Sequence, residues 1–310
     1  MFTIKAIRSY VGPEHVPVAQ LGPYLGLTPA QVKMYTHRRI LGLGTVALAP
    51  RVPLEDMLVE VGRRSLELVD PSTVRYVVHA HTLSPPGPAG RDVLGGVVRA
   101  LGLRARSMSV SHLNCAGGVF AAKIAARLLA TLRPHEQVLL LCGDKAFSPA
   151  IQHVRGTTVM ADGVAAAVVG RTGGHEILDV TRDVRSEYYR GVKMEREDSE
   201  RYAAQYPSIL ASTVARSVAR AGLTTADVRL VVPHNVNRIS WQKTADALGV
   251  DLDRVFLDNV AVTSHCYTAD PYINLAELAG TGRLREGDHF VLAAAGMGGS
   301  FAAMTGRYVP

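Results

Sequence analysis

Short β-branched runs alternate with helix-forming segments along this chain. Runs such as YVVHA (76–80) and LVVPH (230–234) are almost wholly apolar, which is typical of strands buried in the interior of a sheet. Predicted helices at 57–69 and 207–221 lie among these runs. The alternation predicts an α/β fold in which helices pack on largely buried sheets.

The same order of elements occurs twice, at an offset of roughly 150 residues. Each copy has a turn and strand ending in a His-containing loop, then a strand and polar loop that open a helix, then a buried strand and glycine turn. The matched segments are 70–84 with 224–238, 100–118 with 247–270, and 137–147 with 290–301. We therefore predict two pseudo-symmetric α/β halves, 1–172 and 173–310.

A cysteine stands at the start of one predicted helix, in the stretch HLNCAGGVFAAKIAARLLA (112–130). From Val119 onward apolar residues recur at spacings of three and four. Unpaired N–H groups and the positive end of the helix dipole activate a thiol at such a position. Cys115 is therefore a candidate nucleophile, and the alternative is a small buried core residue.

Composition is that of an ordinary globular protein. Of the 310 residues, 47% are hydrophobic and 20% charged, which suffices for a sizeable core. No apolar run approaches the roughly 18 to 20 residues that cross a bilayer, and residues 1–12 predict a strand rather than a signal peptide. The three cysteines form no CxxC pair, which fits a reducing compartment and disfavours structural zinc. We expect a cytoplasmic protein with no metal and no membrane segment.

The net charge of +7 bears on the choice of partner. Lys and Arg are scattered, and only six Phe and one Trp are available to interleave with them, which disfavours nucleic acid. An acidic partner protein or an anionic thioester cofactor fits this charge better.

The duplicated pattern predicts where a site would form. Ligands of α/β folds gather at loops beyond the carboxyl ends of strands. If the two halves pack with pseudo-twofold symmetry, Cys115, His234, His265 and the turn GMGG (296–299) converge. A cysteine nucleophile needs an imidazole and backbone N–H donors for a tetrahedral oxyanion, and these residues supply both.

Four segments follow one another in a specific order: NCAGG (114–118), PHNVNR (233–238), SHCYTADP (264–271) and AAGMGGSF (294–301). They resemble the active-site motifs of the thiolase superfamily, in particular those of ketoacyl-ACP synthase III. RGTTVMADGVAAAVV (155–169) is similar to another segment of that family, and the similarity extends over nearly the whole chain.

The resemblance implies an αβαβα thiolase-like layered fold, usually a homodimer. It also implies an acyl group taken from coenzyme A or an acyl carrier protein (ACP), with no tightly bound cofactor. Cys115 would be the acylated nucleophile, His234 the motif histidine, and Asn237 the asparagine that supports it. The backbone amides of Cys115 and of the turn at Met297 and Gly298 would form the oxyanion hole. We expect the small residues behind Cys115 to let an acyl thioester approach.

Three positions depart from the family pattern. His265 stands where the family has Asn; other condensing enzymes of the superfamily use two histidines, and an imidazole N–H can donate to a thioester carbonyl. The segment 233–238 is one residue shorter than its family counterpart, which affects the carrier-protein contact expected of Arg238. The segment 31–40 lacks the Trp that stacks on the CoA adenine in some members, since the only Trp is Trp241. The acyl donor is therefore a carrier protein, or CoA bound differently.

Asp270 and two surface segments are further candidates for a part in the site. Asp270 either orients a histidine or starts a turn before a proline. The loop 83–92, stiffened by three prolines, would lie beside the acyl pocket near the dimer interface. The stretch 182–207 mixes charges with four Tyr and is either a lid over the acceptor site or a solvated helix with charge pairs. The remaining Cys and several His are expected to be packing or loop residues: Cys142, Cys266, His79, His81 and His112.

Two enzymatic functions share an acyl group on Cys115. In one, the acyl group passes to an alcohol or amine on a small molecule, with His234 or His265 as general base. In the other, malonyl-ACP is decarboxylated and its carbanion condenses with the acyl group. The loss of the motif Asn favours the acyltransferase, in a specialised, secondary-metabolite pathway. A non-catalytic partner subunit and a cysteine hydrolase are further alternatives.

Overall fold

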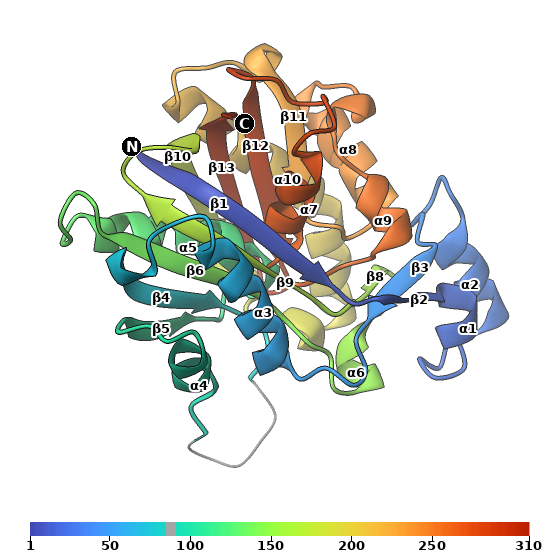
Figure 1. Cartoon of the computed structure of the whole chain (residues 1–310). Helices are drawn as coiled ribbons and strands as arrows, with labels where there is room; N and C mark the ends of the chain where they lie inside the picture. The colour runs from blue at the N-terminus through green and yellow to red at the C-terminus, as the bar shows by residue number, and fades with distance from the viewer. Residues whose placement is uncertain (85–90, 310) are drawn as a thin grey trace.

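The computed structural model describes residues 1–84 and 91–309, and its main feature is a nine-stranded sheet with helices on both faces (Figure 1). The strand order is β11-β12-β13-β10-β1-β9-β6-β4-β5. One half of the sheet holds β1 (Phe2–Val11), β4 (Val74–Ala80), β5 (Arg106–Val110), β6 (Gln137–Asp144) and β9 (Gly163–Gly170). The other holds β10 (His175–Val184), β11 (Val228–Pro233), β12 (His289–Gly296) and β13 (Ser300–Arg307).

The two halves of the sheet repeat one pattern of pairing. β4 pairs in parallel with β6, which pairs antiparallel with β9, and β9 pairs antiparallel with β1. The second half has the same pairings: β11 pairs in parallel with β12, which pairs antiparallel with β13, and β13 pairs antiparallel with β10. In the second half, a parallel bridge between Val231 of β11 and Val255 occupies the place that the parallel pairing of β4 with β5 has in the first half. The three matched sequence segments thus occupy equivalent places, while the division into domains at residue 172 stays a prediction because β1 and β10 join both halves in one sheet.

Helices complete five layers. α5 (Gly117–Leu129) and α10 (Asp270–Leu278) each pack against strands of both halves and lie between them. α3 (Leu54–Leu66) and α4 (Val93–Ala100) cover the outer face of the first half, and α7 (Arg196–Arg220) and α8 (Arg238–Leu248) cover that of the second. The predicted αβαβα layered α/β fold is confirmed, and three separate hydrophobic clusters fill the spaces between its layers.

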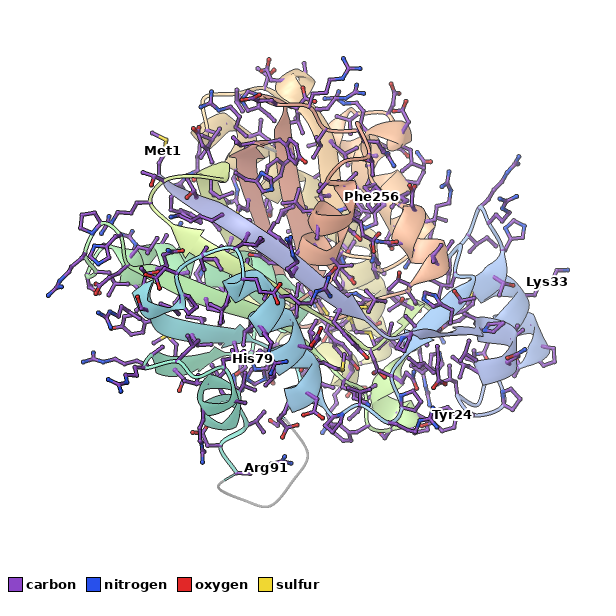
Figure 2. All side chains as sticks on the ribbon, in the orientation of Figure 1. Met1, Tyr24, Lys33, His79, Arg91 and Phe256 are labelled. Atoms are coloured by element: carbon purple, nitrogen blue, oxygen red, sulfur yellow. The ribbon has the colours of Figure 1, made fainter. Side chains whose placement is uncertain are left out.

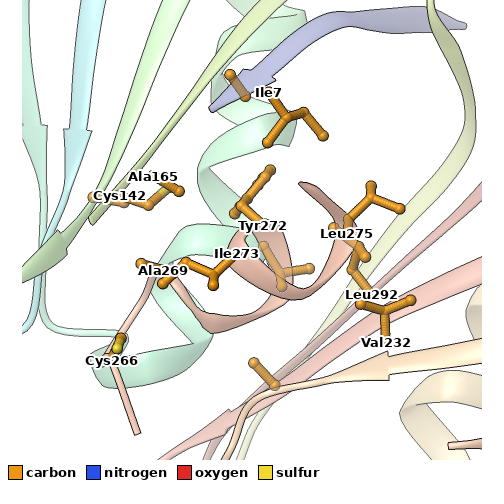
Figure 3. Packing of buried hydrophobic residues seen from close by; sticks show 14 of the residues in the cluster. Ile7, Cys142, Ala165, Val232, Cys266, Ala269, Tyr272, Ile273, Leu275 and Leu292 are labelled. Carbon is orange, nitrogen blue, oxygen red and sulfur yellow. The ribbon is translucent and has the colours of Figure 1, made fainter. Parts of the chain in front are cut away.

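The middle layer carries the largest cluster, and α10 lies at its centre (Figure 3). Tyr272, Ile273 and Leu275 of α10 are each at most 1% exposed, and they meet strand residues such as Ile7 and Leu292 from the two halves. Each large apolar side chain buried in this way contributes about 1.5–3 kcal/mol. The N-terminus of α10 is therefore held firmly between the halves, where the candidate site lies.

Two helix boundaries differ from the sequence prediction. α3 begins at Leu54, directly after Pro53, rather than at residue 57. α7 begins at Arg196, so the helix predicted at 207–221 is only its C-terminal part, and Pro207 lies inside it. Proline in a helix interior removes one N–H donor. The helix continues through it because the buried residues Tyr202 and Ile209, on either side of Pro207, pack into the outer cluster.

The smaller elements lie beyond the end of β1 and along the loops. β2 (Glu14–Pro17), α1 (Val18–Leu21), α2 (Pro29–Thr36) and β3 (Thr45–Leu48) form a projection that carries Tyr24 and Lys33 (Figure 2). The others are α6 (Pro149–Gln152), β7 (His153–Val154), β8 (Thr158–Val159) and α9 (Asp258–Val262). Most of the predicted loop 83–92 lies outside the described residues. None of the helices in the described ranges is long and apolar enough to cross a membrane.

Packing between α5 and the loop before α10 yields a stability prediction. A Cβ at Gly118 would overlap the carbonyl oxygen of Thr268, whereas a Cβ at Gly96 in α4 meets nothing within 4 Å. We expect Gly118→Ala to destabilise the protein by about 1–3 kcal/mol through this overlap. Gly96→Ala should stabilise it by about 0.5–1 kcal/mol, since Ala is the better helix former. Urea unfolding measures both; a Gly118→Ala variant as stable as wild type would contradict the packing described.

Candidate active site

Cys115 lies in a tight turn at the mouth of α5. The turn is the 3-10 helix η2 (Asn114–Ala116), and the cysteine in it is half-buried. His112 and Asn114 have positive φ angles of 67° and 47°, which residues other than glycine seldom adopt. The Asn114 side chain donates to the carbonyl oxygen of Met297. A contact from the other half of the chain therefore secures the conformation that presents the thiol.

The glycine turn between β12 and β13 lies directly against this cysteine turn. A Cβ at Gly296 would stand 2.5 Å from the carbonyl oxygen of Leu113 and 3.2 Å from the Cys115 nitrogen, so the backbones meet more closely than any side chain allows. Gly298 has φ of 100°, which also favours glycine. Met297 and Gly298 are thus brought beside Cys115, and their part in an oxyanion hole stays a prediction.

The glycines behind Cys115 pack against the loop before α10. Gly118 faces the backbone of Thr268, and a Cβ at Gly117 would lie 3.6 Å from the Thr268 side chain. These small residues let this loop approach α5, and the room they were expected to make for an acyl thioester stays a prediction. The loop brought close in this way carries His265.

His265 is the histidine that contacts the thiol. Its Nε2 lies 3.1 Å from Sγ of Cys115, and the residue is only 3% exposed. Positive φ angles at Ser264 (68°) and Tyr267 (52°) shape the loop around it. The backbone N–H of Ala161 donates to the His265 carbonyl oxygen at 2.8 Å. The segment 155–169 of the first half therefore holds this loop of the second half in register.

Asp270 lies on the other side of the His265 ring. Its Oδ2 bonds to Nδ1 of His265 and accepts the backbone N–H of Asn235 at 2.6 Å. Oδ1 accepts the backbone N–H of Cys266 at 2.7 Å and the Asn235 side chain at 3.3 Å. As the first residue of α10, the fully buried carboxylate also meets the positive end of the helix dipole. The structure shows both features that the sequence offered, since Asp270 begins α10 before Pro271 and also contacts the His265 ring, and its role in catalysis stays a prediction.

The charge of His265 follows from its two neighbours. Burial lowers the pKa of His265, but the negative charges of Cys115 and Asp270 and the hydrogen bonds to both outweigh it and raise that pKa to about 10. The ring is therefore an imidazolium near neutral pH, and its Nε2 lies 3.1 Å from the Cys115 sulfur. A positive charge beside a thiol favours the reactive thiolate form.

His234 has a different environment. Its Nε2 lies 3.0 Å from the hydroxyl oxygen of Tyr206, and its ring centroid is 5.5 Å from that of His265. Burial and the charge of His265 lower the pKa of His234 well below 6.5, so this ring is neutral. In the part of the chain that the structure describes, His234 makes no hydrogen bond with Cys115. The two candidate histidines are thus adjacent but opposite in charge.

Asn237 does not support His234 as expected. Its Oδ1 accepts the backbone N–H of Ser240 at 2.8 Å and caps α8, while its Nδ2 donates to the Thr157 carbonyl at 3.0 Å. Capping uses its side-chain oxygen, so the motif asparagine fixes a helix start. Trp241 instead donates to the His234 carbonyl oxygen at 2.8 Å and secures its backbone.

The predicted donor-binding residues lie together. The backbone N–H of Arg238 donates to the Leu41 carbonyl at 3.0 Å, which places this exposed arginine next to the segment 31–40. Arg38 and Arg39 in that segment are also exposed. This basic neighbourhood suits the phosphates of an anionic thioester donor.

The stretch 182–207 has a solvated side with charge pairs and an inner side with buried tyrosines, and its expected role as a lid stays a prediction. Arg196 pairs with Glu200 at 2.7 Å on the solvated side of α7. On the inner side, Tyr202 donates to the Gly296 carbonyl at 3.2 Å and Tyr206 meets His234. The four tyrosines of this stretch were a visible signal, yet the sequence did not show which of them enters the site.

The remaining histidines and cysteines named above lie in packing or loop positions. His79 is 2% exposed and its Nε2 donates to the Gly143 carbonyl at 3.0 Å, while its ring stacks on His81 (Figure 2 labels His79). Cys142 and Cys266 are buried in the middle cluster (Figure 3). His112 belongs to the strained loop before Cys115. Across residues 1–84 and 91–309, no three His, Cys, Asp or Glu side chains gather as a metal site would require.

Comparison with known proteins finds sequence relatives of one kind. The family profile described as 3-Oxoacyl-[acyl-carrier-protein (ACP)] synthase III C terminal matches residues 218–308. A beta-ketoacyl-[acyl-carrier-protein] synthase III of Dinoroseobacter shibae is 34% identical over 174 residues, which cover 54% of this chain and 52%, about half, of that protein. The corresponding protein of Nitratidesulfovibrio vulgaris is 26% identical over 293 residues, covering 84% of this chain and 86% of the relative.

Two solved structures share the whole fold. ChlB3, described as an acyltransferase, superposes with a TM-score of 0.86 at 20% identity, covering 99% of this chain and 98% of its own. The priming β-ketosynthase of the R1128 polyketide pathway superposes with a TM-score of 0.83 at 22% identity, covering 100% and 96%. Fold, site motifs and relatives together support a thiolase-superfamily protein. Within that superfamily, the chain is similar to ketoacyl-ACP synthase III.

The charge of His265 can be measured directly. In wild type its imidazole should stay protonated until the pH approaches about 10. Cys115→Ser and Asp270→Asn each remove one negative charge that raises the pKa of His265, so in both variants the ring should lose its proton at lower pH. Histidine ring NMR titration checks this, with His265→Gln to assign the signal. Titration curves that coincide in all three proteins would contradict the ion-pair geometry.

Proposed function

We propose that this protein is an acyltransferase that takes an acyl group from an acyl-CoA or acyl-ACP thioester onto Cys115 and passes it to an alcohol or amine. The observation that carries the proposal is the line of contacts from Cys115 through His265 to Asp270. A nucleophile, a base and a carboxylate that orients the base are the arrangement used for acyl transfer to heteroatoms. The structural similarity to ChlB3, described as an acyltransferase, supports it.

In the first step, the Cys115 sulfur attacks the carbonyl carbon of the donor thioester. The new S–C bond forms as the bond to the donor sulfur breaks, and the departing thiolate takes the proton from Nε2 of His265. The transient oxyanion lies where backbone N–H groups of Cys115 and the Met297 turn would stabilise it. The products are acyl-Cys115, the free donor thiol and a neutral His265.

In the second step, His265 acts as the base. Acylation removes the negative charge of Cys115, which is one of the main causes of the raised pKa of His265, so that pKa falls. The neutral ring accepts a proton from the acceptor hydroxyl or amine as the heteroatom attacks the acyl carbon. The S–C bond breaks, and the Cys115 sulfur leaves as a thiolate paired again with the His265 imidazolium.

Decarboxylative condensation with malonyl-ACP is the second candidate. It is favoured by the names of the curated relatives, which are beta-ketoacyl-ACP synthases III. The site offers less support for it, because His265 is paired with Cys115 and Asp270, and His234 with Tyr206. A non-catalytic partner subunit would have no use for the Cys115–His265 contact, and a hydrolase would need water at a cysteine that is only half-exposed.

Intact-protein mass spectrometry tests the proposal. Incubation with a panel of acyl-CoAs and acyl-ACPs should add one acyl mass to wild type and none to Cys115→Ala. Alcohol or amine acceptors should then discharge the acyl-enzyme, and His265→Gln should slow this discharge by roughly 10²–10⁴-fold. The matched control is His81→Gln, a histidine that bonds to the Leu83 carbonyl and makes no bond to Cys115 in the described structure.

The outcomes separate the candidate functions. Discharge by malonyl-ACP with release of CO2, and by no alcohol or amine, would establish condensation in place of heteroatom transfer. Discharge by water alone at an undiminished rate would establish a hydrolase. If none of the donors labels Cys115, the catalytic proposal fails and the partner subunit replaces it.

A further inference from the structure

Tyr206 contacts the candidate site from an element that carries none of the family motifs. It belongs to α7, where its ring packs against Phe301 with centroids 5.8 Å apart. Its hydroxyl oxygen lies 3.0 Å from Nε2 of His234. Burial, followed by the neighbouring Tyr202 and Cys115, raises the pKa of Tyr206 well above its usual value, so the phenol is neutral.

In either neutral tautomer of His234, Nε2 is hydrogen-bonded to the Tyr206 hydroxyl. If Nε2 carries the proton, it donates to the Tyr206 oxygen; if it does not, it accepts from the Tyr206 hydroxyl. Nδ1 is buried and without a hydrogen-bond partner in the described structure. His234 therefore has no free Nε2–H to offer to a second thioester while Tyr206 is in place.

Decarboxylation of a malonyl thioester depends on such a donor. Loss of CO2 leaves an electron pair that spreads onto the thioester oxygen, and N–H groups must stabilise this enolate. The nitrogens of His265 are both engaged, with Cys115 and Asp270. With Nε2 of His234 engaged as well, neither ring presents an unoccupied Nε2–H, and Nδ1 of His234 is buried.

We propose that Tyr206 is a specificity-determining residue: by occupying Nε2 of His234, it suppresses decarboxylative condensation and leaves the Cys115–His265–Asp270 line to acyl transfer. This inference rests on the proposed function. Tyr206 acts through His234 and is a positioning residue in this respect.

Removing the phenol oxygen should therefore permit a second reaction. In Tyr206→Phe, Nε2–H of His234 is free to hold the thioester oxygen of malonyl-ACP as the C–C bond to its carboxylate breaks and CO2 leaves. The resulting carbanion attacks the acyl carbon on Cys115. A C–C bond forms, the S–C bond breaks, and the Cys115 sulfur departs with the electron pair. His265, neutral since the acylation step, then takes up a proton from solvent, which restores its contact with the Cys115 thiolate as an ion pair.

The experiment compares CO2 release and acyl transfer in the same acyl-enzyme. Wild type and Tyr206→Phe are acylated, quantified by intact mass, and chased with malonyl-ACP labelled in its free carboxylate. We expect CO2 release per acyl-enzyme to rise roughly tenfold to a hundredfold in Tyr206→Phe, which is the order of effect of one oxyanion donor. Acylation of Cys115 should stay within about threefold of wild type, since Tyr206 makes no bond to His265 in the described structure.

Two further variants identify the cause. Tyr188→Phe removes a phenol from the same aromatic cluster, where it bonds to Gln205 at 2.8 Å rather than to a histidine, and should leave CO2 release at the wild-type value. In Tyr206→Phe combined with His234→Ala, the gain should disappear, because the freed donor is gone. A gain that persists in this double variant would reflect a loosened pocket and overturn the inference.

Failure of this inference is distinguishable from failure of the proposed function. If wild type forms acyl-Cys115 and transfers it, but Tyr206→Phe releases no more CO2 than wild type, Tyr206 does not set the specificity. Rapid CO2 release by wild type itself, with Tyr206 present, also overturns the inference. If no donor acylates Cys115 even in wild type, the proposed function fails first and the inference falls with it.

Discussion

A single buried carboxylate, Asp270, ties the parts of this site together. An unpaired charge in such a position would be strongly unfavourable, so the fold must supply compensating hydrogen bonds. It does so from two places: the loop that holds His265 and Cys266, and Asn235, which follows His234 after β11, while Asp270 itself begins α10. The middle helix, the strand end and the histidine loop can therefore occupy only one relative arrangement. That arrangement sets the orientation of the His265 ring toward Cys115.

The same carboxylate explains why two histidines with centroids 5.5 Å apart differ in charge. Both are buried, and burial alone favours the neutral ring. Cys115 and Asp270 raise the pKa of His265, which remains protonated, whereas His234 faces a neutral phenol and the positive charge of His265. One proton is thereby assigned to the ring that contacts sulfur. The two halves of the fold are related by pseudo-symmetry, yet their two histidines differ in charge because different residues lie beside each ring.

Much of the fold could be predicted from the sequence, because the apolar patterns that define its strands are local and occur twice along the chain. The β-branched runs at 76–80 and 230–234 lie in equivalent strands, and the duplication predicted their common pairing. Helix boundaries were less accessible. Pro207 suggests a helix start, and only the packing of Tyr202 and Ile209 into one cluster shows why α7 continues through it.

For the site, motif order brought Cys115, His234 and His265 together, but it did not show how they pair. Pairing depends on side-chain directions and on residues from distant elements, such as Tyr206 on α7 and the capping role of Asn237 on α8. The packing of the glycines after Cys115 on Thr268 was likewise not predicted, because this closeness exists only in the folded chain. A scaffold of this kind fixes where reactive groups stand, while a few hydrogen bonds decide which nitrogen is free. Chemistry can therefore change through one neighbouring hydroxyl with no change in the fold that carries it.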